Sequence, residues 1–312
     1  MNKLAAVTRS IPALRKLAHP CLLCMHKCEA DREKNKKGFC GALQKAAVYS
    51  YSPHHGEEPP LSGTRGSGTI FFTHCNMRCV YCQNYTFSRE SEFQEIETPY
   101  LAEIMLGLQR MGCHNINLVS PTHYAYQIAD AMRLAIEGSL DIPIVYNTGG
   151  YDSLEVIKLL DGIIDIYLPD MRYSEDLMAA KFSSAPGYVK NNRLLIKEMF
   201  RQVGVLKQDK EGIAKKGVIV RLLILPNNVS DTLSTLKFLQ EEVSRDIYLS
   251  VMSQYYPTYL AGNYPDIARR INEREYKEII EAVEKLGFTN GWIQGFGTET
   301  ERFLGTRIKP RL

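Results

Sequence analysis

After residue 65 the chain alternates short apolar runs with longer segments in which apolar residues recur every three or four positions. The short runs are typical of buried strands, and the longer segments are typical of amphipathic helices. Strands are predicted at residues 69–73, 116–119, 144–146, 163–168, 218–225 and 247–251. Helices are predicted near residues 98–111, 122–138, 152–160, 174–182, 188–202, 231–243 and 276–286.

This alternation of strands and helices favours an α/β fold with a parallel sheet. Six strand–helix units predict a partial (β/α)6 barrel. In barrels of this type the functional side chains stand at the carboxyl ends of the strands. Candidate chemistry is therefore expected directly after each predicted strand.

Residues 1 to about 65 have a different pattern and are predicted to be irregular. They include a turn-rich stretch with Pro53, Pro59 and Pro60, and few apolar residues for a core. Such a segment would need a bound metal to hold its shape. We therefore predict three parts: a cysteine-rich metal-binding segment (1–65), a core barrel (66–260) and a C-terminal helical extension (261–312).

Charge and hydropathy exclude some classes of protein. The 312 residues carry a formal charge of only +3, far from the strongly basic balance of a nucleic-acid-binding protein. No apolar stretch approaches the length of a membrane helix, and Arg9, Arg15 and Lys16 interrupt the N-terminal region where a signal peptide would lie. We therefore expect a cytoplasmic protein with no membrane partner, and the charge does not favour a nucleic-acid partner.

Seven of the eight cysteines fall into two tight groups, and Cys113 alone stands apart. In a reducing compartment disulfides are disfavoured, so grouped cysteines indicate metal binding or redox chemistry. Cys113 follows a predicted helix end and is expected to pack as a small apolar residue.

The second group is a triplet with the spacing C-x3-C-x2-C, and it directly follows the first predicted strand. Its members are Cys75, Cys79 and Cys82. A [4Fe–4S] cube normally takes four thiolates, so three on one loop would leave one iron open to a substrate or cofactor. A zinc site completed by a fourth ligand such as His74 is the alternative.

The first group is a complete four-ligand set. Its members are Cys21, Cys24, Cys28 and Cys40. Four thiolates can close a zinc tetrahedron or a [4Fe–4S] cluster, and the spacing does not decide between them. Without a metal, four reactive thiols would stand on one loop, so a second bound metal is expected.

The segment from Gly66 to Asn84, which contains the triplet, resembles the radical S-adenosylmethionine (SAM) superfamily. Within it the chain is most similar to the pyruvate formate-lyase activating enzymes, and especially to their PflX-type relatives. The resemblance implies a radical SAM barrel in which the open iron binds SAM. One electron from the cluster then breaks the sulfonium C–S bond, and the 5′-deoxyadenosyl radical abstracts a hydrogen atom.

The resemblance also implies which residues contact SAM. Tyr81, the aromatic residue inside the triplet, is expected near the adenine. After the second strand the activating enzymes have Gly-Gly-Glu, which binds the SAM amino group. This chain has Ser-Pro-Thr-His-Tyr at residues 120–124. Ser120 and His123 are the expected substitutes there.

Similar matches follow the later strands. Asn147 begins a turn, Asn-Thr-Gly-Gly, that is similar to a family turn at the cofactor. Asp170 and Arg172 are similar to an Asp and a Lys of the activating enzymes. Arg221, inside an apolar strand, matches an arginine that contacts the SAM carboxylate, and Gln254 follows the sixth strand.

The predicted function is reductive cleavage of SAM for hydrogen abstraction, with activation of a glycyl-radical partner protein as one outcome. The resemblance implies a reductant such as flavodoxin or ferredoxin. Modification of a small molecule, peptide or RNA is an alternative. A further alternative is a non-enzymatic iron–sulfur protein for electron transfer, but it does not explain why one site has three cysteines and the other four.

Overall fold

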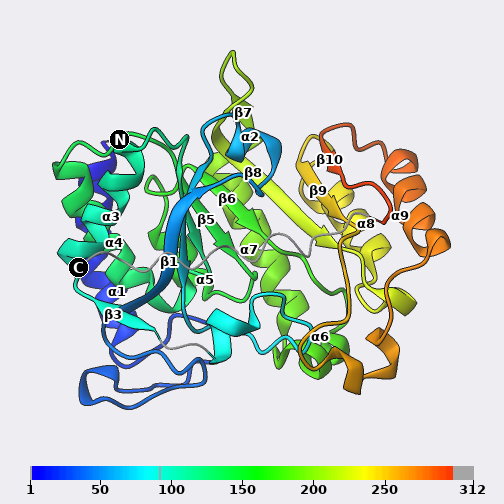
Figure 1. The fold of residues 1–312 in the computed structure, drawn as a ribbon, viewed down its shortest axis with the longest axis horizontal. Helices are drawn as coiled ribbons and strands as arrows, with labels where there is room; N and C mark the ends of the chain where they lie inside the picture. Colours follow the sequence, from blue (N-terminus) through cyan, green and yellow to red (C-terminus); the bar gives the residue numbers. More distant parts are fainter. Residues whose placement is uncertain (1, 91–92, 298–312) are drawn as a thin grey trace.

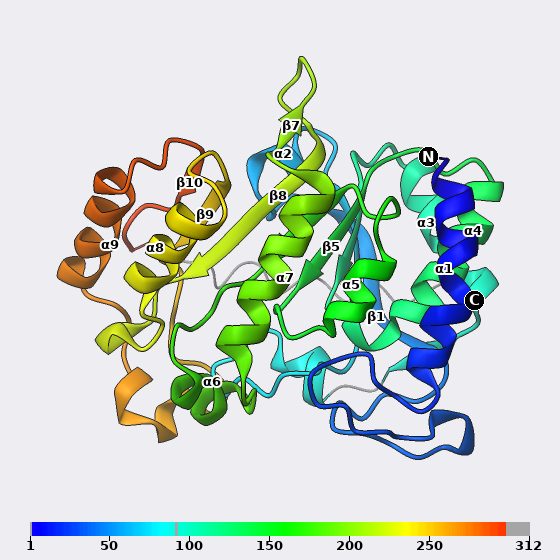
Figure 2. The ribbon, with the colours of Figure 1, turned by 180° about the vertical axis from the view of Figure 1, so that it is seen from behind.

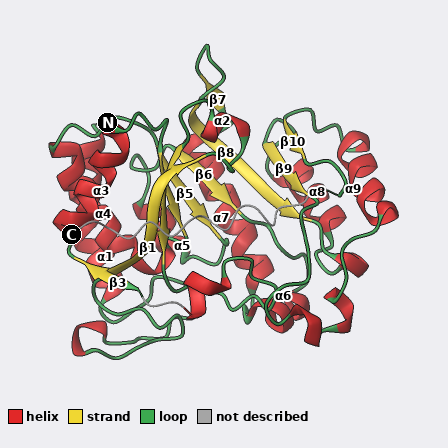
Figure 3. Ribbon diagram, in the orientation of Figure 1, coloured by secondary structure: helices red, strands yellow, loops and turns green. Residues whose placement is uncertain are grey.

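The computed structural model describes residues 2–90 and 93–297. Its centre is one large sheet with the strand order β10-β9-β8-β6-β5-β4-β2-β1-β3, and β7 pairs with β8 (Figure 1 and Figure 3). The strands are β1 (Ala46–His54), β2 (Ser67–Phe72), β3 (Gln94–Ile96), β4 (Ile116–Val119), β5 (Ile144–Thr148), β6 (Ile166–Pro169), β7 (Lys207–Gln208), β8 (Ala214–Leu223), β9 (Tyr248–Met252) and β10 (Gly291–Ile293).

The sheet is mostly parallel. Along the path β2-β4-β5-β6-β8-β9-β10 every pair of neighbouring strands is parallel. Strand β1, in contrast, is antiparallel to both β2 and β3. The six predicted strands correspond to β2, β4, β5, β6, β8 and β9 and are confirmed. Since the sheet path runs from β10 to β3 without joining its ends, the barrel formed by the described residues is open.

Helices cover the outer face of this sheet, and Figure 2 shows α7 and α5 in front of the strands, with α1 against α4 at the edge. The longer helices are α1 (Lys3–Ala18), α3 (Thr98–Arg110), α4 (Ala125–Glu137), α5 (Leu154–Leu159), α6 (Asp176–Ser183), α7 (Tyr188–Val203), α8 (Thr232–Glu242) and α9 (Glu273–Lys285). Short helical turns lie at Arg32–Lys34, Thr86–Glu90, Thr122–Tyr124, Pro226–Asn228, Ala261–Asn263 and Pro265–Ile267. All seven predicted helices are present. None of the described helices is both long and apolar enough to cross a membrane.

The N-terminal segment is not irregular, and that prediction was wrong. It forms α1 and contributes β1 to the central sheet. Val7, Leu14 and Leu23 are fully buried in the main core, where α1 packs against α4 and α5. The apolar residues of α1 and β1 complete a core that the rest of the chain supplies. Of the predicted C-terminal extension, residues 298–312 lie outside the described residues.

A short helix, α2 (Pro59–Ser62), fills the inner side of the sheet. Leu61 is fully buried and packs with Val145, Leu168 and Ile219. Side chains two positions apart along a strand point to the same face, so the next inward position after Val145 on β5 is Asn147. The inner face therefore changes from apolar to polar towards the carboxyl ends of the strands.

The turn after β5 depends on glycine. Gly150 has a φ of +75°, and a Cβ there would stand 2.1 Å from Asn192 Nδ2 and 2.6 Å from the Asp170 carbonyl oxygen. Asn192 uses this space to donate to the carbonyls of Gly150 (3.1 Å) and Asp170 (3.0 Å). The glycine thus lets α7 clamp the ends of β5 and β6 together.

We expect Gly150→Ala to destabilise the protein more than Gly187→Ala. Both residues have a positive φ, but a Cβ at Gly187 would meet nothing within 4 Å. Gly187→Ala should cost only the left-handed strain, about 1–2 kcal/mol. Gly150→Ala should cost about 2 kcal/mol more, because the added methyl group overpacks the clamp. Equilibrium urea denaturation measures both, and equal losses would contradict this account of the turn.

Candidate active site

Polar side chains from the carboxyl ends of the strands line one cavity of about 340 Å³. Five strands, β4, β5, β6, β8 and β9, contribute these side chains. They are Ser120, Asn147, Asp170, Arg172, Arg221 and Ser250. The cavity thus lies where the barrel fold was predicted to carry its chemistry.

The three cysteines of the triplet line this same cavity. Cys79 is buried, and Cys75 and Cys82 are half-buried. Hydrogen-bond donors point at two of the sulfurs: the Met77 amide donates to Cys75 Sγ (3.4 Å), and the Ser183 hydroxyl donates to Cys79 Sγ (3.0 Å). Such bonds stabilise anionic sulfur and tune iron–sulfur centres.

The donor set fits a [4Fe–4S] cluster. Within residues 2–90 and 93–297, no group of three or more Cys, His, Asp or Glu side chains surrounds one point as ligands of a single ion do. Each thiolate of a cube binds a different iron, so the sulfurs need only face a shared space. Burial, together with nearby Cys79 and Cys75, raises the pKa of the Cys82 thiol to about 12. Metal ligation is what deprotonates a thiol in such a place.

The triplet loop is held by the end of α6. The amides of Arg78 and Val80 donate to the carbonyls of Ser183 and Phe182, each at 2.9 Å. A chain of hydroxyls joins Tyr81 to the sulfur of Cys79: Tyr81 bonds Tyr173 (2.6 Å), Tyr173 bonds Ser183 (2.7 Å), and Ser183 donates to Cys79.

Tyr81 is almost fully buried, at 3% exposure, and lies on the cavity wall. Burial raises the pKa of its hydroxyl to about 12, so it stays neutral and can donate. Its ring edge meets Tyr255, with the ring centroids 5.8 Å apart. The structure therefore gives Tyr81 both a position in the cavity and a structural link to a cysteine.

Most of the predicted SAM contacts are brought together. Tyr81, Ser120, Asn147, Asp170 and Arg221 all line the cavity, although they come from five separate segments. Arg172 pairs with the Asp170 carboxylate. Gln254 also lines the cavity and accepts from Gln294 (3.0 Å).

His123 was predicted at this site and is not there. Its side chain is 1% exposed, does not line the cavity, and bonds through Nε2 to the Thr73 carbonyl (2.8 Å). The cause is the helical turn at Thr122–Tyr124, in which all three residues are buried. Thr122 is similarly buried and donates to Asp152 (2.7 Å). Of this segment only Ser120 faces the cavity.

Two glutamates that the sequence analysis did not identify are paired with Arg221. Glu58 holds the guanidinium with both oxygens, at 2.7 Å from Nε and 2.8 Å from Nη2, and Glu57 also binds Nη2. Nη1 has only a long contact to Asn147 Oδ1 (3.5 Å). Arg221 therefore has no free pair of guanidinium nitrogens with which to bind the carboxylate of a ligand in a bidentate way. The two acids lie in a turn with no periodic pattern, so nothing in the sequence linked them to Arg221.

The N-terminal cysteines lie outside this cavity. Cys21, Cys24 and Cys40 are buried, whereas Cys28 is exposed. Burial raises the pKa of the Cys24 thiol, and its proximity to the other three sulfurs raises it further. Two of the four also share a partner, since Arg32 Nη2 lies 3.0 Å from Cys21 Sγ and 3.5 Å from Cys40 Sγ.

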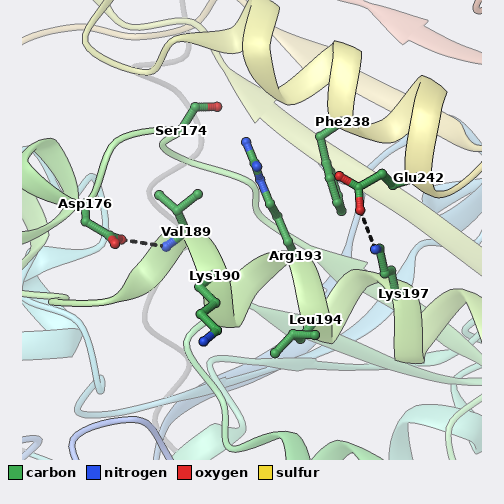
Figure 4. Close-up of a pocket in the computed structure, with 9 residues that line it drawn as sticks. All are labelled: Ser174, Asp176, Val189, Lys190, Arg193, Leu194, Lys197, Phe238 and Glu242. Atoms are coloured by element: carbon green, nitrogen blue, oxygen red, sulfur yellow. Dashed lines mark hydrogen bonds and ion pairs between the residues drawn. The ribbon is translucent and has the colours of Figure 1, made fainter.

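A second hollow, of about 410 Å³, lies between α7 and α8 (Figure 4). Lys197 there pairs with Glu242 (2.5 Å), and the Arg193 guanidinium lies 4.9 Å from the centre of the Phe238 ring. This hollow is on the helical side of the molecule and contains no cysteine, so it is not the candidate active site.

A family model described as the radical SAM superfamily matches residues 69–171. Two curated proteins of Methanocaldococcus jannaschii, both uncharacterised, match most of the chain. MJ0674 is 32% identical over 278 residues, which is 85% of this chain and 74% of that protein. MJ0808 is 24% identical over 269 residues, which is 78% of this chain and 73% of that protein.

Similarity to solved structures is more distant. Streptococcus suis SuiB bound to S-adenosylmethionine aligns with a TM-score of 0.48 and 11% identity, over 71% of this chain and 48% of that one. A radical SAM methyltransferase from Sphaerobacter thermophilus aligns with a TM-score of 0.45 and 12% identity, over 81% of this chain and 77% of that one. Similarity of this kind carries no information on substrate.

We expect Glu58→Gln to lower the free energy of unfolding by about 2 kcal/mol, because it weakens two buried charge-assisted hydrogen bonds and leaves Glu57 as the carboxylate partner of Arg221. The matched control is Glu242→Gln, which breaks the exposed pair with Lys197 and should cost less than about 1 kcal/mol. Urea denaturation of proteins with equal iron content measures both. Similar small losses would show that the Arg221 pair is not a buried ionic contact.

The same variant has an expected pH dependence. Burial alone would raise the pKa of Glu58, but Arg221 outweighs it and holds the pKa below the usual 4.5. The stability from ionised Glu58 is therefore present above pH 4.5 and is lost as the pH falls through the lowered pKa. The difference in stability between wild type and Glu58→Gln should shrink on acidification, and a constant difference would contradict this assignment.

Proposed function

This chain belongs to the radical SAM superfamily, and from that premise we propose that Cys75, Cys79 and Cys82 hold a [4Fe–4S] cluster with one open iron for SAM. One observation carries the proposal: these three sulfurs and the polar strand ends of the matched segment face one cavity. The cluster and SAM together, when bound, supply a 5′-deoxyadenosyl radical through one-electron reduction of the sulfonium.

The chain's own residues position these groups and exclude water. Met77 and Ser183 stabilise anionic sulfur by donating to Cys75 and Cys79. Met77, Tyr81 and Phe87 are buried side chains in the walls of the cavity. A reactive radical needs such exclusion of solvent, which prevents side reactions.

For SAM itself we propose contacts from Tyr81, Ser120, Asn147 and Asp170. The support is that all four line the cavity with the triplet. Arg221 could contribute only Nη1, since its other nitrogens are bound to Glu57 and Glu58. The proposed carboxylate contact of Arg221 is thus a single bond, unlike the bidentate pairing that arginine often makes.

We propose activation of a glycyl-radical partner protein as the first candidate for hydrogen abstraction, with the oxidoreductase character of the activating enzymes. Modification of a small molecule, peptide or RNA is the second. The charged group of Glu57, Glu58 and Arg221 favours the second, because a glycine Cα carries no charge for it to recognise. A glycyl-radical signal on a co-purified protein after incubation with SAM and reductant distinguishes the first candidate.

The proposal includes a low-potential reductant such as flavodoxin or ferredoxin, and a cytoplasmic setting. All eight cysteines are free thiols in the structure, which suits a reducing compartment. It also includes a second metal, zinc or iron–sulfur, at Cys21, Cys24, Cys28 and Cys40. The buried Arg32 guanidinium within reach of the Cys21 and Cys40 sulfurs supports this part, because its charge would be neutralised by metal-bound thiolates.

We expect Cys79→Ala to abolish formation of 5′-deoxyadenosine, because the cube loses one of only three protein ligands. The assay uses anaerobically reconstituted protein with dithionite and SAM, and product is measured by chromatography. Cys113→Ala is the matched control: Cys113 is also buried but does not line the cavity, and this variant should retain turnover. Wild-type turnover by Cys79→Ala would place the cluster elsewhere.

A further inference from the structure

We infer that the hydroxyls of Tyr81, Tyr173 and Ser183 couple the cavity to the cluster at the cysteine triplet (the triplet cluster). A ligand that donates a hydrogen bond to Tyr81 makes this cluster easier to reduce. Tyr173 and Ser183 are then positioning residues, because they act through Cys79 and do not touch the ligand. The inference rests on the proposed function, since it takes the cluster and its SAM as present.

The three hydroxyls form a short chain that is shielded from water. Tyr173 stands in the middle, with its oxygen 2.6 Å from that of Tyr81 and 2.7 Å from that of Ser183. Ser183 in turn donates to Cys79 Sγ at 3.0 Å. Tyr173 is 1% exposed and Ser183 is fully buried, so solvent does not compete for these bonds. Hydrogen bonds in such a row polarise and strengthen one another.

The backbone holds Ser183 against the triplet loop. Arg78 and Val80 are the neighbours of Cys79 on either side. Their amides donate to the carbonyls of Ser183 and Phe182, each at 2.9 Å. These bonds fix the Ser183 hydroxyl beside the sulfur, so the contact does not depend on the tyrosines for its position. What the tyrosines change is its strength.

The number of protons fixes the direction of these bonds. A thiolate bound to iron has no proton, so Cys79 accepts from Ser183. Each hydroxyl has one proton to donate, so Ser183 accepts from Tyr173, and Tyr173 accepts from Tyr81. The Tyr81 proton is thus used within the protein, and its oxygen is left to accept. Tyr81 therefore favours a ligand that donates at this point, such as one with an amino or hydroxyl group.

A donor on the ligand strengthens every bond in the hydroxyl chain. A hydroxyl oxygen that accepts a hydrogen bond becomes a better donor through its own proton, so the effect passes from Tyr81 to Ser183 and on to Cys79. Reduction adds negative charge to the cluster, and hydrogen bonds to its sulfurs stabilise that charge and raise the potential. The cluster of the empty protein is therefore harder to reduce, which limits the loss of electrons before SAM binds.

The members of the hydroxyl chain have different surroundings. Tyr81 lines the cavity, whereas Tyr173 and Ser183 do not. Cys79, at the other end, is one of the three proposed ligands of the cluster. A substitution at Tyr173 therefore breaks the link between the cavity and the sulfur, but it removes neither a contact to SAM nor a ligand of the cluster. This separation makes the coupling testable.

Redox titration of the anaerobically reconstituted protein, followed by EPR, tests the effect of the hydroxyl chain on the cluster. The signal of the triplet cluster is the one that Cys79→Ala lacks. Ser183→Ala should shift its midpoint potential to a more negative value, and Ser183→Thr, which keeps the hydroxyl, should shift it less. Tyr173→Phe should give a smaller negative shift than Ser183→Ala, because Ser183 still donates. It serves as the test where Ser183→Ala holds less iron.

Tyr255→Phe is the matched control. Tyr255 is 1% exposed and its ring packs against Tyr81, but its hydroxyl donates to the Ile267 carbonyl at 2.6 Å, outside the hydroxyl chain. This variant also loses a buried hydroxyl, yet it should leave the potential unchanged. An unchanged potential in both Ser183→Ala and Tyr173→Phe, or an equal shift in Tyr255→Phe, would overturn the inference.

The same titration with saturating SAM tests the coupling. Direct binding of SAM to the cluster contributes equally in wild type and Tyr173→Phe, so comparing the two isolates the effect of the hydroxyl chain. The change in potential on adding SAM should be more positive in wild type than in Tyr173→Phe. Anaerobic equilibrium dialysis establishes the SAM concentration that saturates each protein. The same change in both proteins would overturn the coupling.

These outcomes are separate from failure of the proposed function. If wild type holds the triplet cluster but forms no 5′-deoxyadenosine, the proposed function fails, while the potentials of the variants still decide whether the hydroxyl chain acts on the cluster. If wild type cleaves SAM and the two changes in potential are equal, the proposed function stands and the coupling fails.

Discussion

The attachment of the triplet loop to α6 is the contact on which the candidate site depends. Two backbone hydrogen bonds fix the loop to the last turn of α6, and the Ser183 hydroxyl reaches the sulfur of Cys79. Without these bonds to α6, nothing would hold the three cysteines of this glycine-free loop so that they face the same cavity. The sequence supplies the ligands, but α6, about a hundred residues further along the chain, aims them.

Charge in the cavity is the second constraint. The inner face of the sheet is apolar around Leu61 and becomes polar at Asn147, Asp170 and Arg221. Burial makes each ionised group costly unless it is paired, and the chain pairs them within the cavity. A ligand that enters must therefore match polar groups that already have partners, which makes the site selective.

The sequence predicted the six parallel strands and their helices, because strong apolar periodicity fixes which face of each element is buried. It also predicted that Asp170 and Asn147 would stand at the same edge of the sheet, where parallel strands end. It did not predict α1 and β1, because Pro12 lies inside α1 and Pro53 inside β1, and each proline reads as an interruption of a regular element. Nor did it predict that Glu58 would hold Arg221, because that contact spans more than 160 residues and no local pattern encodes it.

The most direct test of the central claim is ENDOR spectroscopy of the reduced protein with SAM labelled with ¹⁵N in the amino group and ¹⁷O in the carboxylate. The variant Cys21→Ala/Cys24→Ala/Cys28→Ala leaves only the triplet cluster to be observed. The account predicts hyperfine coupling from both labels to that cluster, because the open iron binds SAM directly. A reduced cube that shows coupling from neither label, with SAM present in excess, would contradict it.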